Sequence, residues 1–290
     1  MLNYLEKHLP KIVIAPTTLA MIVCMYGFIL WTGLLSFTKS RMMPQWEYVG
    51  IDQYIRLFEN PRWHVALDNL VVFIVLFIAI SLAIGLLLAI FLDQRIRNEG
   101  VIRTIYLYPM AISFIVTGTA WKWILNPGLG IEKMFRDMGF LEFEFRWLVE
   151  QDMAIYTIVI AAVWQSSGFV MAMFLAGLRG VDDNLVKAAK IDGASTFRSY
   201  WHVILPIMRP VFFSAIVILT HIAIKSFDLV QALTGGGPGY ASDLPANFMY
   251  TFAFNRAQMG LGAASAMIML FGVLAVLIPY LYSELRERET

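Results

Sequence analysis

The sequence predicts an all-α polytopic membrane protein with six transmembrane helices. Of its 290 residues, 59% are apolar and only 15% are charged, and the mean hydropathy is +0.67. A soluble domain has about 25% charged residues, and one core cannot hide this apolar excess, so lipid must cover part of it. The apolar residues also gather in six long runs that charged residues separate. These features exclude water-soluble, disulfide-stapled secreted and disordered classes of protein.

Each apolar run is interpreted as a membrane-spanning helix, because a bilayer core of about 30 Å requires roughly 20 apolar residues of helix. The first run follows Lys11, and its length favours a membrane anchor over a cleaved signal peptide. All six runs are expected to form one transmembrane domain over residues 1–290. The predicted spans cover residues 12–37, 70–92, 105–125, 154–175, 211–230 and 261–281.

Basic residues predict the orientation of the chain. With six spans both termini lie on one side, and more Lys and Arg residues fall on that side than on the other, which places both termini in the cytoplasm. The net charge of +1 provides no overall basic field that would hold nucleic acid. The residues predicted inside are Lys7, Lys11, Arg95, Arg97, Arg103, Arg179, Lys187, Lys190, Arg198, Arg209, Arg286 and Arg288; those predicted outside are Lys39, Arg41, Arg56, Arg62, Lys133, Arg136, Arg146 and Arg256.

Two hydrophilic segments are too long for simple turns. The outer segment, residues 38–69, carries aromatic side chains suited to the membrane interface or to a docking surface: Trp46, Tyr48, Tyr54, Phe58 and Trp63. The inner segment, residues 176–210, is the largest predicted cytoplasmic feature.

The cytoplasmic segment 176–210 predicts two short helices joined by a turn. Asp182 or Asp183 is a suitable N-cap for a helix ending near Ile191, and Gly193 provides a backbone that can turn. A second helix is expected from Thr196 to Leu205, ending at Pro206. Such a unit would fit a groove on another protein, and a basic loop lying on lipid headgroups is the alternative.

This segment resembles the EAA loop of binding-protein-dependent ABC transporter permeases. The pattern AAxxDGA, followed by a helix and Leu-Pro, lies between the fourth and fifth of six predicted spans, as in that family. The resemblance covers nearly the whole chain, belongs to the carbohydrate branch related to maltose and glycerol-phosphate permeases, and is nearest to glucose-type permeases. The residues that carry it are Leu175 to Leu178, Ala188, Ala189, Asp192, Gly193, Ala194, Leu205 and Pro206, with Tyr48 to Tyr54, Ala66 to Asn69, Arg103 to Pro109, Ser113, Trp121 to Trp123, Trp164, Gln165, Gly168, Phe227, Asp228 and Leu233 to Pro238.

The resemblance implies a type I ABC importer permease fold and an inner-membrane subunit that imports a sugar, such as the monosaccharide glucose. It implies as partners a second permease, which forms a heterodimer with this chain, a cytoplasmic ATPase dimer and an extracytoplasmic sugar-binding protein. It also implies that an ATPase-coupling loop includes Ala188, Ala189, Asp192, Gly193 and Ala194. The sequence contains no GxxxxGK[ST] phosphate loop, so ATP and Mg²⁺ are expected in the partner and no cofactor in this chain.

Two positions depart from the family pattern. Asp182 stands where a proline usually opens the coupling helix, which is a mild change because Asp is itself a good N-cap. Lys187 stands where the name-giving glutamate is expected, and this reverses a charge. An ion pair between that glutamate and the ATPase therefore cannot be assigned to Lys187.

Polar residues within the spans are candidates for the substrate pathway. Lys225 and Asp228 are spaced to share one helical face, with His221 on the same side, so they predict either a structural ion pair or contact with substrate. Trp123, Trp164 and Gln165 are further candidates, because a sugar pocket needs an aromatic face and polar partners.

No catalytic motif or metal-ligand spacing is present, so the chain is expected to transport rather than to catalyse. The alternative function is a secondary transporter driven by an ion gradient, in which Lys225 and Asp228 would relay ions or protons. Such transporters usually have paired broken helices in repeated halves, and no internal repeat is evident here.

Overall fold

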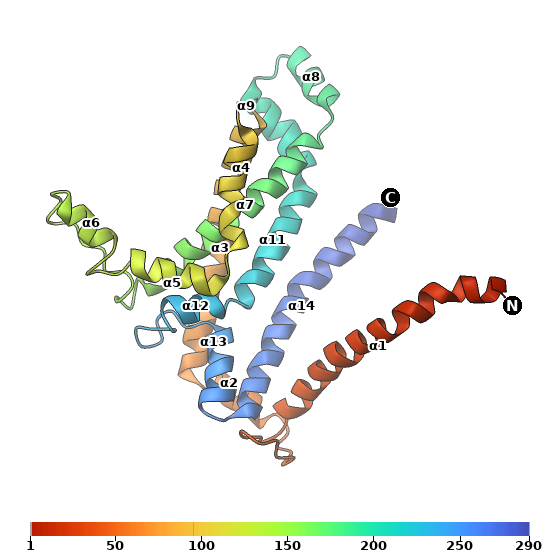
Figure 1. Cartoon of the computed structure of the whole chain (residues 1–290), viewed down its shortest axis with the longest axis vertical. Coiled ribbons are helices and arrows are strands. Elements are labelled where there is room, and N and C mark those ends of the chain that lie inside the picture. The colour runs from red at the N-terminus through yellow and green to blue at the C-terminus, as the bar shows by residue number, and fades with distance from the viewer. Residues whose placement is uncertain (1, 95, 290) are drawn as a thin grey trace. The chain divides into compact units, whose positions relative to one another are not determined.

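The computed structural model describes residues 2–94 and 96–289, and of these the side chains of residues 2–9, 12 and 283–289 fall outside the description. The described chain is helical, with no strand and only an isolated bridge between Thr38 and Tyr48 (Figure 1). The predicted all-α class is confirmed. Contacts divide the chain into two compact units, Met1–Asn60 with Phe248–Leu270, and Pro61–Asn247 with Phe271–Thr290.

The first unit contains α1 (Leu2–Ser36), α2 (Asp52–Phe58), η3 (Thr251–Asn255) and the beginning of α14 (Met259–Glu289). None of the most apolar window of α1, within Val13–Ser36, is buried in the chain, so this helix offers its surface to lipid or to another subunit. Two hydrogen bonds join the elements where α1 ends. The Gly260 amide donates to the Ser40 carbonyl at 3.0 Å, and the Gln53 side chain donates to the Thr38 carbonyl at 3.1 Å.

The second unit is organised around α7 (Ala154–Arg179). This helix is buried over 72% of its most apolar window, and it packs against α3 (Pro61–Asp93) and α11 (Arg209–Ile224). Gly85 allows close approach between α3 and α7, because a Cβ there would lie 2.5 Å from the Val170 side chain. The remaining elements are α4 (Glu99–Leu107), η1 (Tyr108–Ala111), α5 (Phe114–Ile124), α6 (Ile131–Asp137), α8 (Asp183–Ile191), α9 (Thr196–Ser199), η2 (Tyr200–Ile204), α10 (Leu205–Ile207) and α12 (Asp228–Leu233), with α13 (Pro245–Tyr250) next in the chain.

Four of the described helices are long and apolar enough to cross a membrane, and two bent helix pairs would raise the number to six. The predicted range 105–125 falls on α4, η1 and α5, which are bent by 100° at a break where Ser113 caps α5 by accepting from the Val116 amide at 3.3 Å. The range 211–230 falls on α11 and α12, with a break at residues 225–227. Arg95 and the side chains of Lys7, Arg286 and Arg288, used for the predicted orientation, lie outside the described residues.

Candidate functional site

Helix α8 begins at the cap that the sequence predicts. In Figure 1 it lies beyond the ends of α4, α7 and α11. Of the two candidate caps, Asp182 takes the role: its carboxylate accepts from the Asn184 amide at 2.8 Å. Asp183 lies in the first turn and Lys190 in the last, where their charges match the helix dipole.

Helix α8 ends in a Schellman turn at Gly193. The Ala194 amide donates to the Ala189 carbonyl at 2.9 Å, and the Gly193 amide donates to the Lys190 carbonyl at 3.1 Å. Gly193 has φ +82°, a left-handed backbone conformation that residues other than Gly and Asn rarely adopt. A Cβ at Gly193 would meet no atom of this chain within 4 Å. The positive φ angle, and not a steric clash inside the chain, is therefore what favours glycine here.

The second half of the segment differs from the prediction. Ser195 caps α9 by accepting from the Arg198 amide at 3.3 Å, but the helix does not end at Pro206 as predicted; it continues to Ile207 and then bends by 65° into α11. The wider π turn of η2 explains this, because the Leu205 amide reaches back to the Tyr200 carbonyl just before the proline ring. The turn thus accommodates the ring inside α10, which ends one residue later, at Ile207.

The segment exposes apolar side chains to an unusual degree. No residue of α8 is buried, and Lys187, Ala188 and Asp192 are exposed while Ala189 is half-buried. The aromatic rings of Phe197 and Trp201 stack on each other with centroids 6.3 Å apart. Exposed apolar groups gathered on one segment indicate a surface that another protein covers. Their exposed fractions are 48% for Leu185, 86% for Ile191, 78% for Phe197 and 61% for Trp201.

An ion-pair cluster joins the helix ends next to this segment. Arg179, the last residue of α7, lies 2.8 Å from Glu99 of α4 and 3.8 Å from Asp93 of α3. No local sequence pattern marks these three residues as a group, because they lie far apart in the chain. The cluster ties α3, α4 and α7 together where the chain leaves α7 toward α8.

The predicted shared helical face of Lys225 and Asp228 is wrong. Helix α11 ends at Ile224, Lys225 is its C-cap, and α12 begins only at Asp228. The Phe227 amide donates to the Lys225 carbonyl at 2.8 Å, a tight turn that breaks the helical spacing. Both side chains are exposed, and among the described residues they form no ion pair with each other. The break places Asp228 in the first turn of α12, where the helix dipole favours a carboxylate.

The other pathway candidates do not form one polar pocket. Gln165 is buried in α7 and donates to the Ile112 carbonyl at 2.7 Å, so it holds the break between η1 and α5. Trp164 packs edge-on against Trp121 with ring centroids 6.0 Å apart and lines a cavity of about 680 Å³ with mainly aliphatic walls. Trp123 is exposed. His221 lines a separate cavity of about 210 Å³.

No metal site is evident: among the described residues, no three His, Cys, Asp or Glu side chains gather in a group that could hold a metal ion.

A buried ion pair that the sequence analysis did not identify fixes the glycine-rich loop after α12. The Nε atom of Arg62 lies 2.7 Å from Asp243 Oδ2, with the Asp243 side chain fully buried. Arg62 also lies 4.4 Å from the centre of the Tyr240 ring, and Asn69 donates to the Asp243 carbonyl at 3.0 Å. Burial raises the pKa of the Asp243 carboxyl, while the guanidinium of Arg62 opposes that change. A Cβ at Gly236 would lie 2.9 Å from Asp243 Oδ1, so glycine is needed beside the carboxylate.

We expect Asp243→Ala to destabilise the subunit by about 2 kcal/mol, because removal of the carboxylate leaves the largely buried Arg62 guanidinium without this charged partner. Thermal unfolding of the purified protein measures the change. The double variant Arg62→Met/Asp243→Leu should lose less stability than Asp243→Ala, since no charge then stays buried. Equal losses in the two variants would contradict an energetic role for this ion pair.

Comparisons with known proteins agree with this arrangement. Residues 81–288 match the family described as "Binding-protein-dependent transport system inner membrane component". A probable ABC transporter permease of Pyrococcus horikoshii is 37% identical over 98% of this chain and 99% of its own. A xylose/arabinose import permease of Haloferax volcanii is 33% identical over 92% of this chain and 85% of its own. A trehalose/maltose transport system permease of Thermococcus litoralis is 29% identical over 97% of this chain and 95% of its own.

Solved structures give the same fold. A chain of a bacterial ABC transporter involved in the import of alginate superposes with a TM-score of 0.81, at 19% identity and over 99% of this chain and 98% of that one. The type I importer permease fold implied by the resemblance is therefore confirmed. Family match and fold together place the protein in the inner membrane as a transport subunit. This chain belongs to the binding-protein-dependent inner-membrane components, the permease subunits of ABC importers.

Proposed function

We propose that this permease imports a sugar, with a monosaccharide such as glucose as the first candidate. The observation that carries the proposal is its similarity over nearly its full length to permeases named for sugars, including xylose/arabinose and trehalose/maltose. The motifs that resemble glucose-type permeases support the choice of a monosaccharide. In this proposal the substrate crosses the membrane between this subunit and a second, similar permease, with both termini of this chain in the cytoplasm.

The partner set in this proposal includes a cytoplasmic ATPase dimer, which binds ATP and Mg²⁺, and an extracytoplasmic sugar-binding protein. The exposed segment from α8 to α10 supports the ATPase contact. Its apolar side chains Leu185, Ile191, Phe197 and Trp201 would be covered by the ATPase, and the turn at Gly193 sets the direction of α8. The coupling residues are Ala188, Ala189, Asp192, Gly193 and Ala194.

The proposed substrate pathway includes the helix break at Lys225 and Asp228. Exposed charged groups at a break between two short helices can reach a water-filled passage and bind sugar hydroxyl groups. His221, one turn before Lys225, is included for the same reason. Trp123 and Trp164 remain candidates for stacking against a sugar, whereas Gln165 would act indirectly by holding the start of α5.

The test of the proposed function is sugar-stimulated ATPase activity of the complete transporter in lipid nanodiscs. The panel of sugars is led by glucose, xylose and a disaccharide, each with its binding protein. Stimulation by glucose or xylose supports the proposal, and stimulation by the disaccharide alone would overturn the monosaccharide assignment. A complex that assembles with the ATPase but responds to no sugar would overturn the substrate class. Failure to assemble with any ATPase would favour an ion-driven transporter instead.

We expect Lys225→Ala to raise the half-saturating sugar concentration by about tenfold, since the lost bond to a charged donor is worth about 1.5 kcal/mol. Uptake into proteoliposomes measures this, and the amount of inserted subunit is measured in parallel. Unchanged uptake kinetics at normal insertion would show that Lys225 has only a structural role.

A further inference from the structure

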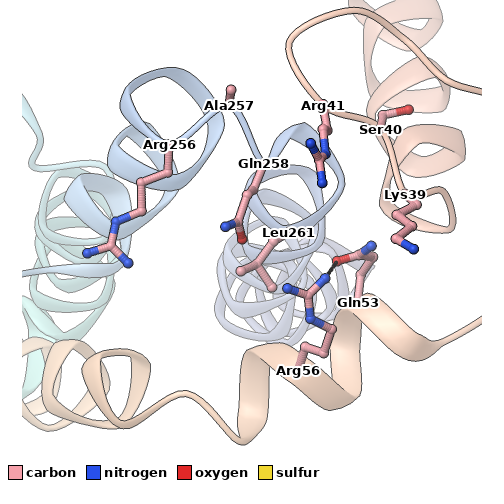
Figure 2. Close-up of a pocket in the computed structure, with 9 residues that line it drawn as sticks. All are labelled: Lys39, Ser40, Arg41, Gln53, Arg56, Arg256, Ala257, Gln258 and Leu261. Carbon is pink, nitrogen blue, oxygen red and sulfur yellow. Dashed lines mark hydrogen bonds between the residues drawn. The ribbon is translucent and has the colours of Figure 1, made fainter.

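A cavity rich in basic residues lies in the first compact unit, and none of its lining residues belongs to the coupling segment or to the pathway candidates. Its volume is about 390 Å³, and all nine residues that line it belong to this unit. Figure 2 shows that they come from the chain after α1, from α2, and from the turn into α14. The lining residues are Lys39, Ser40, Arg41, Gln53, Arg56, Arg256, Ala257, Gln258 and Leu261.

The cavity gathers positive charge without a balancing carboxylate. Four of its lining residues are Lys39, Arg41, Arg56 and Arg256, and among the residues that the structure describes none of them forms an ion pair. Arg56 donates to the Gln53 side chain at 3.4 Å, an uncharged partner. A concave site lined by one sign of charge attracts ions of the opposite sign. The ligand that fits this cavity is therefore an anion.

The walls of the cavity are held in place by buried contacts. Gln53 is buried and donates to the Thr38 carbonyl at 3.1 Å, which fixes α2 against the chain after α1. Ala257 has φ +53°, a conformation that non-glycine residues seldom adopt and that is concentrated at functional sites. It separates Arg256 from Gln258, and both residues line the cavity. The Arg256 guanidinium lies over the Phe252 ring, 4.6 Å from its centre. The basic groups are thus presented by a preformed framework.

The position of the cavity identifies the kind of anion. It lies directly after the apolar helix α1, which ends at Ser36, and beside the start of α14 at Met259. Both helix ends bound candidate membrane spans, so we expect the cavity at the level of the membrane surface. Trp31 and Trp46 pack edge-on at 5.2 Å, and the exposed Tyr48 lies nearby in the chain, as in the aromatic belts of membrane interfaces. The apolar surface of α1 within Val13–Ser36 is unburied in the chain and can accept acyl chains.

We propose that this cavity binds the phosphate headgroup of an anionic phospholipid, with the acyl chains lying along α1. Guanidinium groups suit this ligand because they bind phosphate oxygens in pairs. The proposal is independent of the substrate and of the ATPase contact. It predicts that the subunit selects anionic lipid, such as phosphatidylglycerol, over zwitterionic lipid.

The test is native mass spectrometry of the full chain with added phosphatidylglycerol or phosphatidylcholine. The variant Arg41→Gln/Arg256→Gln removes two charges from the cavity, and Lys133→Gln/Arg146→Gln removes two from another segment predicted on the same side. We expect the first variant to bind phosphatidylglycerol at least tenfold more weakly than the wild type, because each basic group near an anionic lipid contributes roughly a fivefold factor. The matched control should change less than twofold. Phosphatidylcholine binding and thermal unfolding in phosphatidylcholine should stay unchanged in both variants.

Three results would overturn the proposal. Equal losses of phosphatidylglycerol binding in the two variants would indicate a general charge effect. Inorganic phosphate that binds the wild-type cavity as tightly as the lipid would make this a site for free anions. If the wild type shows no preference for phosphatidylglycerol while Arg41→Gln/Arg256→Gln weakens only the response to the binding protein, the cavity receives an acidic protein surface.

Discussion

Replacing Gly193 by valine should uncouple ATP hydrolysis from transport while the subunit still accumulates in the membrane. Gly193 adopts φ +82° within a Schellman turn, and a β-branched side chain strongly disfavours that angle. The strain, about 1–2 kcal/mol, is large enough to break the turn that sets the direction of α8. Since α8 has no buried residue, the substitution should leave the packing of the other helices unchanged. We expect sugar uptake per ATP hydrolysed to fall at least about tenfold, because this strain equals roughly a tenfold change in an equilibrium.

The matched variant is Gly193→Asn. Asparagine tolerates the left-handed conformation, so it should retain most of the coupling even though its side chain is similar in size to valine. The measurements are uptake and ATPase activity in the same proteoliposomes. Equal uncoupling by both residues would show that close packing against the ATPase, rather than the backbone angle, requires glycine. Normal coupling in Gly193→Val would contradict the docking role of this segment.

The difference between the two halves of the coupling segment shows what local sequence can predict. The cap of α8 and the turn at Gly193 depend on single residues whose local preferences are strong. The sequence therefore predicts the turn, and it limits the cap to Asp182 or Asp183, of which the structure selects Asp182. The sequence does not predict that the helix includes Pro206, because no residue preference marks the π turn at residues 200–204 that precedes it. Proline usually ends a helix, and here the preceding turn widens to admit it.

The spans show a similar limit. Hydropathy marks an apolar run but does not reveal a bend inside it, so residues 105–125 and 211–230 read as continuous helices although each contains a break. The break after Lys225 is what made the predicted face with Asp228 wrong. Beyond the break, α12 packs closely on α5, where a Cβ at Gly118 would lie 2.7 Å from the Ala232 side chain.

Partners that lie far apart in the chain could not be predicted from the sequence. Arg62 and Asp243 are 181 residues apart, and each reads locally as an ordinary polar residue near an apolar run. Only the fold brings them together. The same holds for the cavity in the first unit: its basic residues Lys39, Arg41, Arg56 and Arg256 are each predicted on the outer side, but no local pattern in the sequence brings them together.

Replacing Gly168 by alanine should have the second large effect, a loss of folding stability rather than a loss of coupling. Gly168 lies in α7 against the end of α4, and a Cβ at this position would overlap the Tyr106 carbonyl oxygen and lie 2.6 Å from the carbonyl carbon. Both obstacles are backbone atoms, which cannot turn aside as a flexible side chain would. Helix α7 would have to move away from α4. This shift would disturb the core contacts of Val170, Met171 and Phe174, which lie on the same helix.

We therefore expect Gly168→Ala to destabilise the subunit by about 3 kcal/mol or more and to reduce the folded protein recovered from membranes. Gly272→Ala is the matched control, since Gly272 also lies inside a long helix but a Cβ there would meet no atom within 4 Å. That variant should be neutral or slightly more stable, because alanine favours helix over glycine. Thermal unfolding in detergent compares the two variants. If Gly168→Ala unfolds at the wild-type temperature, the contact between α4 and α7 leaves room for a methyl group, and this explanation is wrong. If both variants are equally unstable, the loss comes from replacing helical glycine in general and not from this contact.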